Sequence, residues 1–169
     1  TAYEIKECDW SSDVCSSDLL SAAELSSVKT ISGVTGAGSV DTLVAGTSTI
    51  DLTSTTLSSI EVLKANTTDN TTFTLDAADM AGLQSITGNT GTDTLVANAT
   101  AFNLSSTVLT SVEVLKAGLT TGTTFTVDAA DLSAGGTSSA VTGGTATATT
   151  AVDSLDRKST RLNSSHIPL

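Results

Sequence analysis

The sequence repeats itself with a period of 52 residues. The stretch DTLVAGTSTIDLTSTTLSSIEVLKA, which starts at Asp41, matches DTLVANATAFNLSSTVLTSVEVLKA, which starts at Asp93. A weaker repeat divides the period into alternating shorter and longer rungs, which begin at Thr49, Thr72, Ala101 and Thr124. One rung cannot bury its own apolar residues, so the repeat predicts stacked rungs that share a continuous core.

Each rung combines two predicted strands with a turn. Residues 72–75 alternate threonine with apolar residues, which favours a short half-buried strand. The following DAADMAGL indicates a turn or short helix opened by a capping aspartate, and IEVLKA indicates a second strand. The rungs also share an apolar-x-x-apolar-x-x-apolar-x-small spacing, seen at Leu25, Val28, Ile31 and Gly33, at Leu57, Ile60, Leu63 and Ala65, at Met80, Leu83, Ile86 and Gly88, and at Leu109, Val112, Leu115 and Ala117.

These patterns predict an all-β fold. We expect a parallel β-solenoid, like a β-helix or β-roll, of about five 23- or 29-residue rungs over residues 20–155, with short helical turns and with ends that lack capping rungs. Aromatic residues make up only 3% of the chain, which is a poor supply for a compact globular core, and stacked Leu, Ile and Val supply the core instead.

Stacking predicts that equivalent residues form columns along the solenoid axis. One predicted column holds every phenylalanine of the chain and consists of Ile50, Phe73, Phe102 and Phe125. Two further columns would carry charge on alternate rungs only, Glu61, Gln84 and Glu113 in one and Lys64, Thr87 and Lys116 in the other. Like charges would then lie about 10 Å apart instead of facing each other on adjacent strands.

The two ends of the chain differ from the array. Residues 1–19 and 156–169 hold the only Tyr, Trp, Cys, Arg, His and Pro residues, and they resemble peptides translated from sequencing-adapter DNA. We expect them to be non-native tails without selected function. The other interpretation is a disulfide or metal site at Cys8 and Cys15 with His166 as ligand or base, but neither the four-ligand zinc set nor a catalytic thiol constellation is complete.

The acidic composition narrows the range of partners. The net charge is -11, so we expect no nucleic-acid partner and no binding to an anionic membrane, because phosphate binding needs clustered Lys and Arg. No run of about 18 apolar residues is present, so we expect no membrane insertion, and no signal peptide is visible in this segment.

The stretch GNTGTDTLV, residues 88–96, is the best candidate for a binding site. It resembles the nonapeptide of haemolysin-type (RTX) calcium-binding repeats, with Asn89 in place of the second glycine, and GAGSVDTLV, residues 36–44, is a looser copy with one residue inserted. The resemblance implies Ca²⁺ as cofactor, with Asp41 and Asp93 as metal ligands. The alternative interpretation is a simple glycine-aspartate turn.

Paired aspartates recur in the array as Asp76 with Asp79 and as Asp128 with Asp131. Aspartate at a helix start accepts hydrogen bonds from free backbone N–H groups, so capping explains both the position and the repetition of these pairs. Cation binding and general acid-base catalysis are the alternatives. Catalysis would call for a His, Arg or Tyr nearby, and the array has none, so we expect that the protein is not an enzyme.

The array as a whole resembles bacterial exported repeat proteins, namely β-solenoid adhesins, surface-layer proteins and type I secreted RTX proteins. This resemblance implies a structural or adhesive segment of a larger secreted or cell-surface protein, whose partners are the neighbouring repeats of the parent chain and a surface ligand that the sequence does not define. The alternatives are a calcium-dependent folding module of an RTX-like protein and a fragment of a polysaccharide-active β-helix enzyme.

Overall fold

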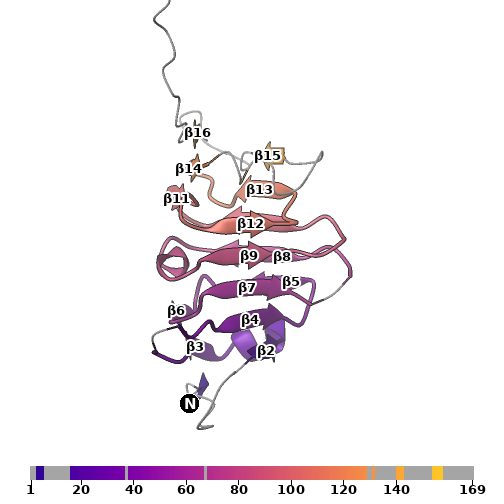
Figure 1. Cartoon of the computed structure of the whole chain (residues 1–169). Helices are drawn as coiled ribbons and strands as arrows, with labels where there is room; N and C mark the ends of the chain where they lie inside the picture. Colours follow the sequence, from indigo (N-terminus) through magenta and orange to yellow (C-terminus); the bar gives the residue numbers. More distant parts are fainter. Residues whose placement is uncertain are drawn as a thin grey trace, which may run out of the picture.

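The chain folds as a parallel β-solenoid with three sides (Figure 1). The computed structural model describes residues 3–5, 16–36, 38–66, 68–128, 131, 140–142 and 154–157. Every strand pair in these ranges is parallel, and the short strands stack into about four complete turns. The predicted all-β parallel solenoid is therefore confirmed, although the complete turns number about four where we expected about five rungs.

The chain visits the three sides in a fixed order. Side 1 consists of β1 (Tyr3–Ile5), β3 (Val28–Ser32), β6 (Thr56–Ser58), the 3₁₀ helix η1 (Asp79–Ala81), β11 (Ala101–Asn103), β14 (Thr124–Val127) and β16 (Ser154–Arg157). Side 2 consists of β2 (Ser16–Leu20), β4 (Thr42–Ala45), β7 (Val62–Ala65), β9 (Ser85–Thr87) and β12 (Val108–Thr110). Side 3 consists of β5 (Thr49–Asp51), β8 (Thr72–Leu75), β10 (Thr94–Ala97), β13 (Val114–Ala117) and β15 (Ala140–Thr142), and the short helix α1 (Ala22–Leu25) packs against β5.

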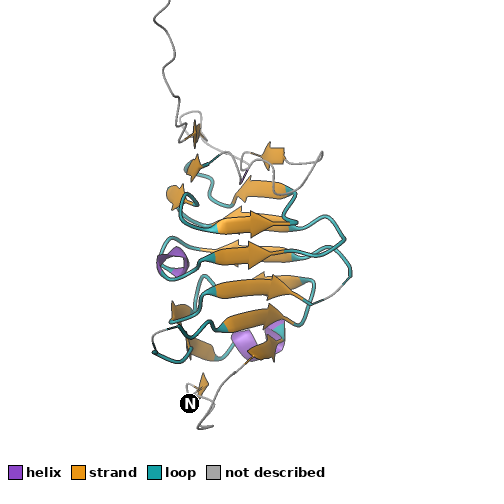
Figure 2. Ribbon diagram, in the orientation of Figure 1, coloured by secondary structure: helices purple, strands orange, loops and turns teal. Residues whose placement is uncertain are grey.

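Two strands per rung were predicted and three sides are found. The stretch DAADM does form the expected short helix, η1, and this helix lies between β6 and β11 on side 1 (Figure 2). Where the equivalent position carries STTL or SSTV, the chain forms a third strand instead, β6 or β12. Because η1 takes the place of a strand, side 1 is divided into two three-stranded sheets, while sides 2 and 3 are continuous five-stranded sheets.

The 52-residue repeat does not equal a whole number of turns. Phe73 pairs with Leu95, so one turn is complete between them, and Phe102 follows a few positions later on the next side. The segment from Phe73 to Phe102 thus covers one turn and one side. From Leu43 on side 2 to Leu95 on side 3 the chain passes seven sides, which is two turns and one third.

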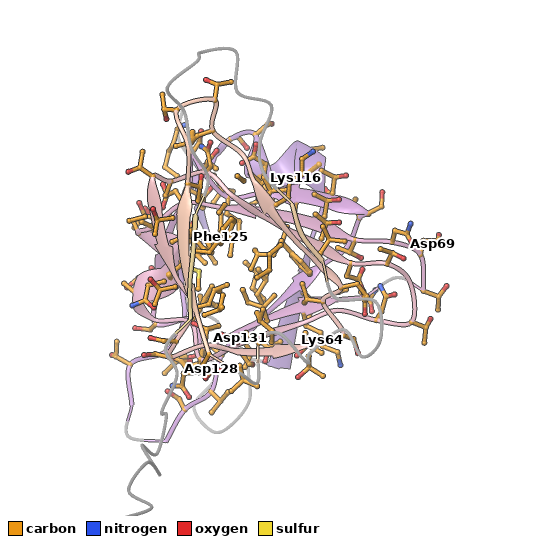
Figure 3. All side chains as sticks on the ribbon, turned by 90° about the horizontal axis from the view of Figure 1, so that it is seen from above. Lys64, Asp69, Lys116, Phe125, Asp128 and Asp131 are labelled. Carbon is orange, nitrogen blue, oxygen red and sulfur yellow. The ribbon has the colours of Figure 1, made fainter. Side chains whose placement is uncertain are left out.

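This advance overturns the predicted columns. Ile50 stacks on Phe73 on side 3, whereas Phe102 stacks on Phe125 on side 1, so the single phenylalanine column is wrong. Lys64 and Lys116 likewise project from sides 2 and 3, as the view down the axis shows (Figure 3). The predicted glutamate column is wrong in the same way, because the backbone N–H of Gln84 donates to the carbonyl of Glu61 while that of Glu113 donates to Asp93.

The core consists of inward-facing residues from all three sides. Each strand alternates buried and more exposed residues, as the half-buried strand pattern predicts. On side 1 the rings of Phe102 and Phe125 meet edge to face, with centroids 6.2 Å apart and planes at 70°. Side 2 contributes the column Leu43, Leu63, Ile86 and Leu109, and side 3 contributes Ile50, Phe73, Leu95 and Leu115.

The predicted boundaries of the tails fall inside strands. The boundary at 19/20 lies within β2 and that at 155/156 lies within β16. Cys8, Cys15 and His166, which raised the question of a disulfide or metal site, lie outside the described residues.

Candidate functional site

Asp93 lies at a corner between sides 2 and 3, and its carboxylate is completely buried. The turn at residues 88–93 leads from β9 to β10. Oδ2 accepts the backbone N–H of Asn89 at 2.6 Å, and Oδ1 accepts that of Thr71, one turn earlier, at 2.6 Å. Short hydrogen bonds from N–H donors are the usual way to stabilise a buried carboxylate, so Asp93 joins two successive turns.

Two asparagines reinforce this corner. Asn89 donates from Nδ2 to the carbonyl of Asp69 at 2.9 Å and accepts from the backbone N–H of Gly91 at 2.6 Å. Asn70 of the preceding turn accepts from the backbone N–H of Thr92 at 2.8 Å. Asn89, which replaces the second glycine of the nonapeptide, therefore has a structural role in tying the corner together.

A glutamate from the following turn completes the arrangement. The backbone N–H of Asp93 donates to Oε2 of Glu113 at 2.7 Å, and the backbone N–H groups of Glu113 and Val114 both donate to the carbonyl of Asp93 at 3.0 Å. Glu113 was not predicted as a site residue. The signal was present in the sequence, because Glu61 follows Asp41 at the same distance as Glu113 follows Asp93.

Part of this arrangement recurs around Asp41, at the corner between sides 1 and 2. Oδ2 of Asp41 accepts the backbone N–H of Val34 at 2.9 Å, and the backbone N–H of Asp41 donates to Oε2 of Glu61 at 2.8 Å. Asp41 is 6% exposed. The structure therefore places the two predicted metal ligands, Asp41 and Asp93, at different corners, each paired with a glutamate of the next turn.

Glycine is required where the chain enters each corner. A Cβ on Gly88 would lie 1.8 Å from the carbonyl oxygen of Ser111 and 2.5 Å from Oδ2 of Asp93, and a Cβ on Gly33 would make the corresponding contacts with Ser59 and Asp41. Ser59 and Ser111, whose carbonyl oxygens approach these glycines, have positive φ angles of 54° and 51°. The counterpart of Gly88 is therefore Gly33 and not Gly36, as the shared apolar spacing that ends at Gly33 and Gly88 already indicated.

The donor set at Asp93 does not fit a calcium ion. Ca²⁺ needs six to eight oxygen ligands, whereas both carboxylate oxygens of Asp93 face backbone N–H groups. Within the described ranges, no three His, Cys, Asp or Glu side chains are grouped as a metal site. The hydrogen bonds are those of a glycine-aspartate turn, and calcium binding at Asp41 and Asp93 stays a prediction from the sequence.

The pair Asp76 and Asp79 caps a short helical turn, as predicted. Oδ1 of Asp76 accepts the backbone N–H groups of Ala78 at 2.7 Å and of Asp79 at 3.2 Å, while Oδ2 of Asp79 accepts the N–H of Asp76 at 2.9 Å. Asp128 and Asp131 make the same reciprocal pair, at 3.0 and 2.9 Å. Each pair thus forms a capping box in which both members are aspartates.

Burial raises the pKa of the second aspartate in each pair. Asp79 is 2% exposed, and burial, together with the charges of Asp76 and Asp51, raises its pKa to about 7 against the lowering effect of its backbone hydrogen bond. Burial and the charge of Asp128 raise the pKa of Asp131 to about 6, again against a hydrogen bond. The sequence pattern did not reveal this burial, because a capping aspartate is ordinarily exposed to solvent.

The comparisons with known proteins give no relative. No family model, no curated protein and no solved structure matches the chain. Among the described residues, no helix has the length and hydrophobicity that crossing a membrane requires.

Proposed function

We propose that this array is a structural spacer, a rod-like segment of a larger secreted or cell-surface protein. The observation that carries the proposal is the advance of seven sides per 52-residue repeat. Each sequence position moves to a new side in the next repeat, so the repeat maintains the buried core without maintaining any one outer face. The place of the segment in an exported protein is carried by its resemblance to bacterial exported repeat proteins.

A solenoid that binds a ligand along its length would need equivalent side chains to recur on one side. To bind an extended ligand along the axis, a solenoid presents the same side chains on the same side of successive turns. Here Lys64 projects from side 2 and its repeat counterpart Lys116 from side 3 (Figure 3). The carboxylate pairs behave in the same way, since Asp41 and Asp93 occupy different corners. Such a distribution spreads like charges around the rod, which favours a well-solvated spacer over a face built for one ligand.

The spacer role is tested by lengthening the rod. We would insert one, two or three further copies of residues 41–92 between residues 92 and 93, which keeps every junction of the repeat. Each copy should add seven thirds of a turn, or about 11 Å at about 4.8 Å per stacked strand, at constant cross-section. Small-angle X-ray scattering measures both quantities, and a shuffled 52-residue insert is the control. A changed cross-section, or no gain in length over the shuffled insert, would refute the proposal.

Binding measurements distinguish an adhesive segment from a spacer. An adhesive segment would bind a surface polymer saturably, and substitutions of exposed residues on one side would abolish that binding while equivalent substitutions on the other sides would not. Binding that depends on one side in this manner would favour adhesion.

A calcium-dependent folding module is the second candidate. The observation in its favour is that Glu61 and Glu113 each bring a second carboxylate to a predicted calcium turn. Far-UV circular dichroism of the whole chain, melted in millimolar calcium and in chelator, tests it. Identical spectra and melting curves would exclude the module, whereas a large calcium-dependent rise in melting temperature would favour it over the N–H-bonded corner at Asp93.

A further inference from the structure

Side 1 is interrupted where η1 separates β6 from β11, and Asp79 is the first residue of this short helix. Its side chain is 2% exposed, and it occupies the level of the solenoid at which sides 2 and 3 continue as β9 and β10. An ionisable group is therefore buried at the one level where side 1, within the described residues, lacks a strand.

The two carboxylate oxygens of Asp79 have different environments. Oδ2 accepts the backbone N–H of Asp76 at 2.9 Å. Oδ1 is buried and, among the described residues, is the one buried side-chain oxygen or nitrogen without a hydrogen-bond partner. A buried carboxylate oxygen without a donor is costly, and the cost falls when the group takes up a proton and loses its charge.

Two neighbouring carboxylates also favour the protonated form of Asp79. Asp76 precedes η1, and Asp51 ends β5 one turn earlier, and both carboxylates disfavour a negative charge on Asp79. In the following repeat Asn103 takes the place of Asp51, and Asp128 is the charged neighbour of Asp131. Among the charged neighbours that raise the two pKa values, Asp79 therefore has one more than Asp131, namely Asp51.

We propose that Asp79 is a proton-binding site that stabilises the solenoid as the pH falls from neutral to mildly acidic values, with Asp131 as a weaker second site. The geometry supports it through the buried oxygen Oδ1 without a donor, at the level where side 1 lacks a strand, and this outweighs the backbone N–H of Asp76, which favours the charged form. A spacer with this property would be more stable against unfolding at mildly acidic pH than at neutral pH.

The direction in which stability changes with pH follows from the difference in proton binding between the folded and unfolded chain. The pKa of Asp79 is about 7 in the folded chain, against 3.8 for an unperturbed aspartate, and that of Asp131 is about 6. Between about pH 4 and pH 7 the folded chain therefore holds protons that the unfolded chain releases. Stability from these two groups is lost as the pH rises through 4 to 7, and it is fully present below the unfolded pKa.

The test combines carboxyl titration with unfolding. Carbon-13 NMR of the aspartate carboxyls of the whole chain should give a midpoint for Asp79 well above 4 and above that of Asp131. Urea midpoints should be higher at about pH 5 than at about pH 7.5 in the wild type, and Asp79→Asn should remove much of this difference. A midpoint near 4 for Asp79, or an unchanged pH difference in Asp79→Asn, would overturn the proposal.

Asp51→Asn is the matched variant, and it keeps the test decisive even if Asp79→Asn does not fold. It copies the residue at position 103, where Asn103 accepts the backbone N–H of Ser105 at 3.0 Å, just as Asp51 accepts that of Thr53 at 3.1 Å. The local turn should therefore persist. The titration midpoint of Asp79 should move down towards that of Asp131, and a midpoint that does not move would contradict the role of the neighbouring charge.

Discussion

Replacing Gly88 by alanine tests the packing of the corner at Asp93. The added Cβ would lie 1.8 Å from the carbonyl oxygen of Ser111 and 2.5 Å from Oδ2 of Asp93, and Cβ atoms essentially never approach other atoms within 3.0 Å. The oxygen of Ser111 belongs to the backbone of the next turn, so a side-chain rotation cannot relieve the contact. The two turns must move apart at this corner.

Moving the two turns apart weakens two hydrogen bonds, and their energies set the expected loss in free energy of unfolding. The backbone N–H of Gly88 donates to Thr110 at 2.8 Å, and that of Asn89 donates to the buried carboxylate of Asp93 at 2.6 Å. Losing the first costs about 1 kcal/mol and losing the second, a bond to a charged group, about 1.5–3 kcal/mol. Alanine stiffens the unfolded chain and offsets about 0.4–1 kcal/mol of this loss. We therefore expect Gly88→Ala to lower the free energy of unfolding by about 1.5–3.5 kcal/mol.

The measurement is urea unfolding followed by far-UV circular dichroism. With a slope of about 1–3 kcal/mol/M, the midpoint should fall by at least about 0.5 M. Gly36→Ala is the control, because among the described residues a Cβ there would meet only Oγ of Ser39, at 3.9 Å. Equal midpoints for Gly88→Ala and Gly36→Ala would refute the reasoning, since steric contact at the corner is what separates them.

Two further substitutions test the turn and the core. Ser111 has a φ of 51°, so Ser111→Val should lower the free energy of unfolding by about 1–2 kcal/mol while Ser111→Gly should leave it nearly unchanged, and equal urea midpoints for both variants would contradict this. Phe125 is 1% exposed and packs on Phe102, so Phe125→Ala should cost about 3–5 kcal/mol in the same assay, against less than about 1 kcal/mol for alanine at the exposed Thr110. A small effect at Phe125 would show that the side 1 column contributes little to stability.

Several features of the fold could be predicted because they depend on residues close in sequence. Alternation of threonine with Phe73 and Leu75 marks a strand in any half-buried sheet, and β8 is found there. In the turn that leads into η1, Asp76 accepts hydrogen bonds from residues two and three positions further on, so these bonds follow from local geometry. Repetition added the inference that these elements stack in parallel, since no single unit could bury its apolar residues.

The candidate site was only partly predictable for the same reason. Asp41 and Asp93 were found because their turns resemble a calcium motif, and both do lie at tight, buried corners. Their partners Glu61 and Glu113 lie 20 residues further along the chain, and although the sequence repeats this spacing, only the structure shows that it equals one turn. The burial of Asp79 likewise depends on how neighbouring turns cover η1.

By itself, then, the sequence determined a parallel β-solenoid with two strands of each rung, its apolar core residues and its capped turns, because these follow from short-range patterns and their repetition. Only the tertiary structure decided how long each turn is, since Leu43 stacks on Leu63 whereas Ile31 stacks on the more distant Leu57. Corner lengths set that spacing through contacts between turns. The spacing in turn decides which side chains stack, and it is why a repeat that looks like two rungs advances two turns and one third.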